Sequence, residues 1–413
     1  MQVLLLGVGC ASQRVDEYPD YRTRVETAED GPLKVSVAAL SPAESVEVFG
    51  IPLAGLGIQP VWVEVDNRDT AAYWFLPQGM DPHFFPFWEA AEAFTLADGV
   101  IDPQRRDRFR ELALPDIIPA QSTASGFVLA NLDEGFKFIH ADFLRTGELR
   151  HVSLIVGVPD FRADYREQRT FERPLFAEGE VLHIGDDLEA FRQALLQLPC
   201  CATNKSGSRD GDPLNLVIVG GERDAFSALA ERGWSPTEIT WSGSILKMIS
   251  STLQGEPYPY APISPMYLYG RSQDIALQKA RDNIHQRNHL RLWRAPMTFR
   301  DKPVWVGQIS RDIGTRLTIY SPYLTTHKID PDVDEARSAL AEDMAYSQHL
   351  QAIGLVGGVG RASRDAPRGN LTTDPYFTDG YRAVMVFDAA SIQLDDIEFL
   401  PWIMSRDEGA DGS

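Results

Sequence analysis

The sequence predicts an α+β protein, with an N-terminal antiparallel β-sandwich followed by an α/β sandwich domain. The first observation is size, because 413 residues with 44% hydrophobic and 24% charged content are typical of two globular units. The second is a series of alternating apolar strands and turns that ends near residue 161. The third is an alternation of strands and helices after residue 206, followed by short strands.

The first ten residues, "MQVLLLGVGC", are an apolar run that ends in small residues and a cysteine, as secretory segments do. They resemble the lipobox of bacterial lipoproteins, which implies that residues 1–10 are a lipoprotein signal and that Cys10 carries the lipid. Ala11 is not the aspartate associated with inner-membrane retention, so the resemblance implies a position at the periplasmic face of the outer membrane. An apolar strand with an incidental cysteine is the alternative. Residues 11–31 are polar and charged, and we expect a flexible tether.

Residues 32–161 are predicted to form the β-sandwich domain. The run "IQPVWVEVDN" places Val61, Val63 and Val65 on one face of a strand, and "ASGFVLANLDEG", "FKFIHADFL" and "LRHVSLIVGVP" repeat this form. Several such strands at regular spacing are typical of an antiparallel sandwich. The aromatic segment "DPHFFPFWEAAEAF" lies between them, and we expect it to turn helical after Pro86 and to cover a sheet edge.

Residues 162–205 are predicted as a connector that ends in a helix. In "DDLEAFRQALLQLP", Asp186 or Asp187 caps the helix, and the apolar residues fall on one face. Cys200 and Cys201 follow the helix, and no third cysteine or nearby histidine completes a zinc set. We therefore expect two inert or structural thiols.

Residues 206–390 are predicted as the second domain, and residues 391–413 as a C-terminal tail. A buried strand, "LNLVIVGG", precedes a helix over "ERDAFSALAERGW", and short strands and a helix over "DEARSALAEDMAYSQHLQAIG" follow. No run of about 18 or more apolar residues is present, so we expect no membrane-spanning helix.

Several phrases of the second half occur in a fixed order: "LPCCATNKSGSRDGDPLNLVIVG", "APISPMYLYGRSQDIALQK", "RNHLRLWR", "PVWVGQISRDIG", "THKIDPDVDEAR" and "YFTDGYRAVMVF". Together they resemble the LssY-like C-terminal domain from about Leu198 to Asp388. This family has no well-established activity, although in some members the domain is attached to a membrane phosphatase of the phosphatidic-acid phosphatase type. The N-terminal half looks like the sandwich domain found in lipoprotein members of the group.

The charge balance excludes nucleic acid as an expected partner, because 39 basic against 59 acidic residues give a net charge of −20. Residues 271–302 reverse this sign, with eight basic residues against three acidic ones. In "RNHLRLWR" a strand would place Arg287, His289 and Arg291 on one face. Guanidinium groups bind phosphate and carboxylate well, so we predict a site for an anionic small molecule or lipid headgroup. Its predicted ligand-binding residues are Arg271, Lys279, Arg287 and Arg291. In the alternative, the arginines pair internally with aspartates.

A second set of residues allows acid–base or metal chemistry: His289, His327, Asp312 and Asp330. The stretch "THKIDPDVD" also has a purely structural interpretation, in which Asp330 caps a helix and Pro331 occupies its first position. The sequence contains no H-E-x-x-H, G-x-S-x-G or P-loop motif, so it does not indicate a particular metal, cofactor or reaction. We therefore expect a lipid-anchored envelope protein that binds an anionic ligand or an envelope partner. The alternative is a hydrolase acting on a phosphorylated envelope lipid or cell-wall intermediate.

Overall fold

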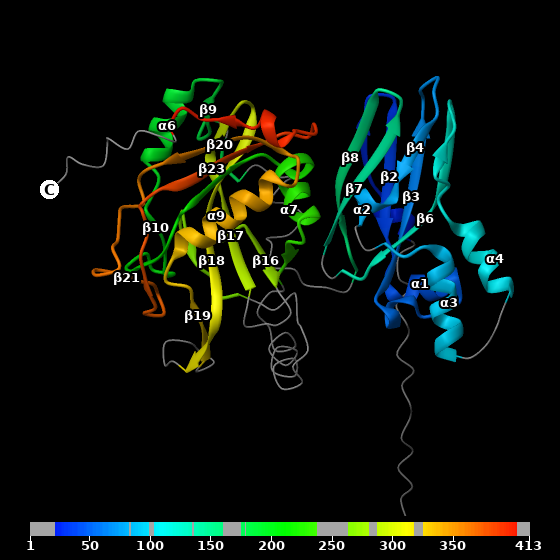
Figure 1. The fold of residues 1–413 in the computed structure, drawn as a ribbon, viewed down its shortest axis with the longest axis horizontal. Helices are drawn as coiled ribbons and strands as arrows, with labels where there is room; N and C mark the ends of the chain where they lie inside the picture. The colour runs from blue at the N-terminus through cyan, green and yellow to red at the C-terminus, as the bar shows by residue number, and fades with distance from the viewer. Residues whose placement is uncertain are drawn as a thin grey trace, which may run out of the picture.

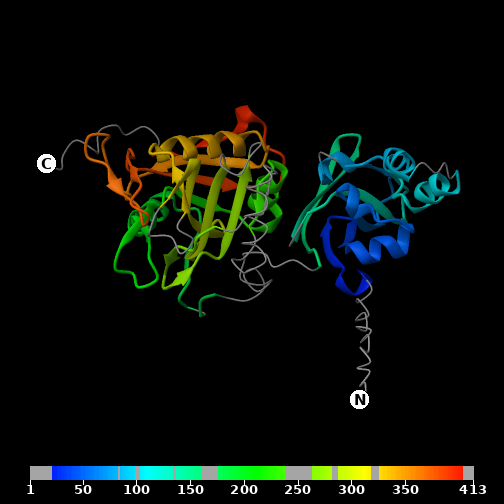
Figure 2. The ribbon, with the colours of Figure 1, turned by 90° about the horizontal axis from the view of Figure 1, so that it is seen from below.

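The computed structural model describes residues 21–81, 84–98, 103–133, 136–159, 175–177, 179–237, 263–280, 287–317 and 325–402. They form two domains that lie side by side, as Figures 1 and 2 show. Both domains mix strands and helices, with more strand than helix, which confirms the predicted α+β class. Cys10 and the first part of the predicted tether lie outside the described residues.

Two antiparallel sheets of four strands build the N-terminal domain. The first has the order β1 (Glu26–Asp30), β2 (Leu33–Ala39), β3 (Ile58–Asn67) and β6 (Ser122–Asn131). The second has the order β5 (Ile117–Ile118), β4 (Tyr73–Leu76), β7 (Phe136–Arg145) and β8 (Glu148–Gly157). Residues 21–31 of the segment predicted as a tether include the helix η1 (Tyr21–Arg24) and the strand β1, which pairs with β2.

One core is shared by the two sheets of this domain. Val61, Val63 and Val65 of β3 are fully buried in it, as their spacing predicts, together with Ile139 of β7 and Val152 of β8. Among the helices, α2 (Pro77–Met80) contributes Met80 to this core. Among the described residues, the others contribute no buried side chain to it: η1 (Tyr21–Arg24), α1 (Pro42–Phe49), η2 (Leu53–Leu56), α3 (Phe87–Asp98) and α4 (Pro103–Leu112). The aromatic segment before and within α3 joins a second apolar cluster with β6, the edge strand of the first sheet, and the Phe85 amide donates to the Leu129 carbonyl of this strand at 2.7 Å. This contact agrees with the expectation that the segment covers a sheet edge.

Ten of the described strands of the C-terminal domain form one mixed sheet. Its order is β13 (Ser235–Pro236), β16 (Ile275–Ala280), β17 (Arg287–Phe299), β18 (Lys302–Leu317), β12 (Leu216–Val219), β23 (Arg382–Phe387), β20 (Leu350–Val356) and β24 (Glu398–Phe399). Two further strands join it, β19 (Thr325–Ile329) beside β18 and β9 (Leu182–Ile184) beside β17. Because β24 pairs with β20, part of the predicted tail belongs to this sheet.

Helices cover both faces of the large sheet (Figure 1). The core on one face includes side chains from η3 (Glu222–Phe226), α7 (Ser227–Glu231) and α9 (Val333–Ala345), and the core on the other includes α6 (Leu188–Leu196). Asp187 caps α6, since its carboxylate accepts from the Ala190 amide at 2.9 Å, as predicted. Smaller elements complete the domain: β10 (Cys201–Thr203), β11 (Asp210–Pro213), β14 (Tyr267–Leu268), β15 (Arg271–Ser272), β21 (Arg368–Gly369), β22 (Pro375–Tyr376) and η4 (Leu394–Asp396).

The adjacent cysteines differ from the expectation, because Cys200 and Cys201 form a disulfide instead of remaining two thiols. The spacing of two adjacent cysteines in the sequence does not determine whether they form a disulfide with each other. No helix in the described part of the chain has the length and apolar character that crossing a bilayer needs.

The outer face of β7 and β8 contacts the C-terminal domain through α7 and η3. Phe138 stacks on Phe226 of η3, with ring centroids 6.4 Å apart and an interplanar angle of 9°. Ile155 packs against the same C-terminal core. The alternation along β7 and β8 therefore gives each strand one face for its own domain and one for the neighbour.

Candidate functional site

The predicted row of basic residues lies on one face of β17 and is buried. Arg287, His289 and Arg291 are 2%, 4% and 6% exposed, whereas Leu290 and Leu292 belong to the core on the opposite face. The predicted strand period is therefore correct. On the neighbouring strand β18, the residues that face this row are also buried and polar: Gln308, Ser310 and Asp312.

Internal partners hold this row in place. His289 Nε2 lies 2.6 Å from Asp312 Oδ2, and Arg287 Nε lies 3.5 Å from the same oxygen. Arg287 Nη1 donates to Gln278 Oε1 at 2.9 Å, and Arg291 Nη1 donates to Gln308 Oε1 at 2.8 Å. The arrangement matches the alternative in which the arginines pair internally, because each has a buried acceptor.

Burial dominates the electrostatics of this layer. It lowers the pKa of His289 to about 4, although the charge of Asp312 acts in the opposite direction. His289 is therefore neutral at pH 7 and donates its Nε2 proton to Asp312. Burial also lowers the pKa of Arg287, against the charge of Asp312. A neutral histidine held by a carboxylate is a competent proton acceptor only where a substrate can reach it.

Arg271 and Asp330 have partners of their own outside the His289–Asp312 pair. Arg271 forms a bidentate contact with Asp274, at 2.8 and 2.9 Å. Asp330 accepts from the Asp332 amide at 3.0 Å, and its own amide donates to the Arg311 carbonyl. The backbone of His327 pairs with Thr315 between β19 and β18, while its side chain lies outside the described part of the chain.

The start of α9 corrects one expectation. The helix begins at Val333 with Asp332 as the flanking residue, so Asp330 is not the cap. Asp330 instead tightens the preceding turn, because its side chain bonds the backbone two residues later. Asp334 accepts from the Thr378 hydroxyl at 2.8 Å and from the Asp379 amide at 2.6 Å. The predicted cap is therefore wrong, because Asp332 makes no capping hydrogen bond and Pro331 lies before the helix. The expected acidic residues of the first turn, Asp334 and Glu335, are present.

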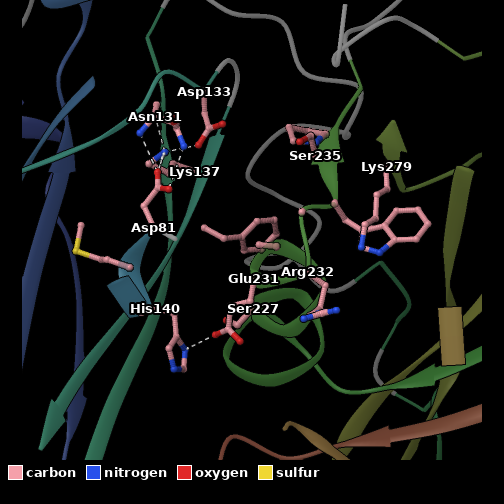
Figure 3. Close-up of a pocket in the computed structure, with 17 residues that line it drawn as sticks. Asp81, Asn131, Asp133, Lys137, His140, Ser227, Glu231, Arg232, Ser235 and Lys279 are labelled. Carbon is pink, nitrogen blue, oxygen red and sulfur yellow. Dashed lines mark hydrogen bonds and ion pairs between the residues drawn. The ribbon is translucent and has the colours of Figure 1, made fainter. Parts of the chain in front are cut away.

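A cleft lies between the two domains and contains two adjoining cavities. The larger, of about 500 Å³, is drawn in Figure 3. Phe138 and Trp234 contribute apolar surface to it from opposite sides, and Lys279 is one of the predicted ligand-binding residues that line it. Its charged and amide side chains are Asp81, Asn131, Asp133, Lys137, His140, Glu231, Arg232 and Lys279.

The two walls of the larger cavity differ in their charged groups. On the C-terminal wall, Asp343 of α9 accepts from Arg232 Nε at 2.9 Å, from Lys279 Nζ at 2.7 Å and from Trp234 Nε1 at 3.2 Å. Two cations therefore share one carboxylate, and Glu231 of α7 adds a second carboxylate to this wall. On the opposite wall, the buried Lys137 contacts two carboxylates, those of Asp81 and Asp133. Among the described residues, the C-terminal wall thus has two cations and two carboxylates, and the N-terminal wall has one cation and two carboxylates.

The smaller cavity, of about 280 Å³, is lined by three histidines and two carboxylates. His140 of β7 and His151 of β8 come from the N-terminal domain, and Glu231 of α7 and His349 come from the C-terminal domain. His140 Nδ1 lies 3.2 Å from Glu231 Oε1, the contact marked in Figure 3, and its Nε2 lies 3.0 Å from Asp142 Oδ1. His349 Nε2 lies 3.6 Å from Glu231 Oε2.

The histidines of this cavity differ in their titration. Burial lowers the pKa of His140, but the hydrogen bond to Asp142 and the charges of Glu231 and Asp142 outweigh it, and the net shift is upward. Burial lowers the pKa of His151, and the charges of His140 and His349 lower it further. The charges near His140 are therefore those of carboxylates, whereas the charges that lower the pKa of His151 are those of the other two histidines.

Residues 192–381 match the family model described as LssY C-terminus. The C-terminal domain belongs to this family. The match includes the β17–β18 layer and, in the cleft, Glu231, Lys279 and His349, whereas His140 and His151 lie outside the LssY domain. No curated protein matches the chain.

Sequence reasoning missed His140, His151, Glu231 and His349. A partial signal exists, because the alternation in "FKFIHADFL" puts His140 and Asp142 on one face of β7, and pairing places His151 opposite Asp142. The contribution of Glu231 and His349 comes from another domain. Only the docking of the domains brings them together, and no local pattern encodes it.

Proposed function

We propose that this protein binds a small anionic ligand in the cleft between its two domains, with Arg232 and Lys279 of the LssY domain as the binding groups. The observation that carries this proposal is that both cations converge on a single carboxylate, Asp343, at a cavity of about 500 Å³. The chemistry that fits is a phosphate or carboxylate group, alone or on a lipid headgroup.

Three features support this location. Ligand sites are concave, combine apolar surface with a few convergent polar groups, and occur preferentially between domains. The larger cavity meets these conditions with Phe138 and Trp234 beside the two cations. In a chain of net charge −20, two cations that contact the same carboxylate at a cavity are also a local concentration of positive groups. Lys279 and Arg232 are about one-third exposed, so they remain accessible to a ligand.

Calorimetric titration of the purified full chain tests this proposal. The probes are inorganic phosphate, glycerol 3-phosphate and vesicles that contain phosphatidylglycerol, which separate a free phosphate from a lipid headgroup. Lys279→Gln should weaken binding about tenfold or more, since a hydrogen bond to a charged group contributes about 1.5–3 kcal/mol. Lys205→Gln, an exposed lysine in the same domain, is the matched control and should bind as wild type. Equal affinity in Lys279→Gln, or no binding of any probe, contradicts the proposal.

We also propose that the chain is attached to the envelope by a lipid on Cys10, at the periplasmic face of the outer membrane. The support is the resemblance of residues 1–10 to a lipobox and the polar composition of the residues that follow. In a bacterial host fed an azide-bearing fatty acid, the wild-type chain should acquire the label and Cys10→Ser should not. Ser12→Ala is the control and should keep it. Label retained by Cys10→Ser would exclude this attachment.

For the N-terminal domain we propose the β-sandwich that its strand pattern predicts, because residues of both sheets contribute to one core. Its role in this proposal is to supply the second wall of the cleft. The hydrolase alternative has one observation in its favour, the 2.6 Å contact between His289 and Asp312. Both side chains are buried, so a substrate would need a rearrangement to reach them, and we place the function in the cleft.

A further inference from the structure

We propose that His140, Glu231 and His349 form a binding site for a divalent transition-metal ion that joins the two domains. The inference is independent of the proposed anionic ligand, because it rests on different side chains in the smaller cavity. One ligand atom from each of the three residues lies within 4.8 Å of the others. Two imidazoles and one carboxylate are a donor set that zinc and iron(II) accept.

The distances fit an ion without a large movement of the backbone. Zinc with nitrogen and oxygen ligands at about 2.0–2.2 Å in a tetrahedron separates neighbouring ligand atoms by about 3.3–3.6 Å. The separation from Glu231 Oε1 to His140 Nδ1 is 3.2 Å, and that from Glu231 Oε2 to His349 Nε2 is 3.6 Å. Each imidazole thus lies at ligand spacing from a different oxygen of Glu231, and one ligand atom from each of the three residues lies within 4.8 Å of the others.

The second nitrogen of each imidazole is already bound by an acceptor. His349 Nδ1 donates to the Asp388 carbonyl at 3.0 Å, which leaves Nε2 as the nitrogen that faces Glu231. His140 Nε2 lies 3.0 Å from Asp142 Oδ1, which leaves Nδ1 toward Glu231. Metal-binding histidines characteristically donate their other ring proton to a carboxylate or carbonyl, because this fixes the tautomer and the ring orientation.

Glu231 gives a further indication. Its Oε1 atom is buried and accepts no hydrogen bond among the described residues, although it lies beside His140. A buried carboxylate oxygen without a donor is costly, and an ion would satisfy it. The Ser153 hydroxyl lies 2.8 Å from His140 Nδ1 and donates to it while no ion is bound. Since a hydroxyl rotates freely, it can release this nitrogen.

Gly79 of α2 lies against Asp142, the residue that contacts His140 Nε2. A Cβ at Gly79 would lie 2.5 Å from Asp142 Oδ2, so a larger residue there would displace this carboxylate. Three protein ligands leave one position of a tetrahedral ion open, and the residues border a cavity of about 280 Å³. The ion would therefore join β7 of one domain to α7 and His349 of the other while keeping a position for water or ligand.

Zinc titration of the metal-free full chain, without an affinity tag and in phosphate-free buffer, tests the proposal. We expect one zinc ion per chain. Glu231→Gln and His349→Gln should each weaken zinc binding by more than the about 10–100-fold typical of changes outside the ligand shell, and Asp142→Asn should fall within that range. His183→Gln, an exposed histidine distant in sequence, is the matched control and should not change the affinity.

The unfolding temperature and the His151→Gln variant provide two further measurements. Zinc should raise the unfolding temperature of wild type and of His183→Gln but not of Glu231→Gln, which preserves side-chain shape. No zinc binding overturns the proposal. The proposal is also overturned if His349→Gln leaves zinc binding unchanged and His151→Gln abolishes it. The ion would then be bound by His140, Asp142 and His151, which all belong to the N-terminal domain.

Discussion

Burial and ion pairing shift the pKa of His289 in opposite directions. Removal from water disfavours the imidazolium, whereas Asp312 at 2.6 Å favours it, and burial prevails because the pKa falls to about 4. The folded protein therefore holds a neutral imidazole where the unfolded chain titrates at about 6.5. Between these two values the unfolded state binds more protons than the folded state, so folding loses stability as the pH falls.

The resulting prediction concerns acid stability. The contribution of His289 should be fully present above pH 6.5 and should be lost as the pH falls from 6.5 to about 4, by roughly 3 kcal/mol for a pKa difference of this size. Denaturant unfolding at intervals of pH measures this slope. His289→Asn should reduce the slope, and the exposed His183→Gln should leave it unchanged. An identical slope in His289→Asn would show that other groups determine acid unfolding.

Arg382 is a buried cation that connects several segments of the C-terminal domain. The side chain is fully buried, and burial lowers its pKa to about 10. It donates to the carbonyls of six residues: Leu195, Leu198, Pro199, Leu214, Gly357 and Gly358. These contacts tie the end of α6, next to the disulfide, to the turn after β20. In the sequence Arg382 precedes an apolar strand, and nothing in the pattern distinguishes it from an exposed arginine.

Among the elements, α1 offers a test of local helix signals. Ser41 and Glu44 form a capping box, since the Ser41 hydroxyl accepts from the Glu44 amide at 3.2 Å and the Glu44 carboxylate accepts from the Ser41 amide at 2.8 Å. Ser41→Ala should cost about 1 kcal/mol of unfolding free energy. Ser45 lies in the same helix with a buried hydroxyl that has no hydrogen-bond partner among the described residues, so Ser45→Ala should be neutral or stabilising. Equal losses in both variants would contradict this.

Sequence predicts elements in this protein better than it predicts their boundaries or their distant partners. The two-residue period along β17 correctly assigns Leu290 and His289 to opposite faces, because alternation is a local property of extended backbone. The same period does not reveal that the polar face is closed, which depends on the strands and loops packed over it. The beginning of α9 differs by two residues because Asp330 bonds within the preceding turn. The histidine cavity requires two domains, so neither half of the sequence specifies it.

At the scale of the whole molecule, the net charge of −20 sets the context for the cleft. An anion approaching the protein is repelled overall, and only a local excess of cations can hold it. Arg232 and Lys279 provide the cations at the C-terminal wall, but Asp343, which contacts both, and Glu231 offset their charge. The affinity of the cleft for an anion should therefore depend on Asp343 as strongly as on the cations.

Asp343→Asn should strengthen the binding of inorganic phosphate, by about tenfold for a change of 1.4 kcal/mol. The amide can still accept a hydrogen bond, but it no longer offsets the charge of Arg232 and Lys279. Because the added attraction is electrostatic, affinity should also decline more steeply with salt than in wild type. Calorimetry at two ionic strengths measures both effects, with the exposed Asp365→Asn as control. The variant should keep the unfolding temperature of wild type. If it does and phosphate binds with unchanged or lower affinity, Arg232 and Lys279 do not hold the anion.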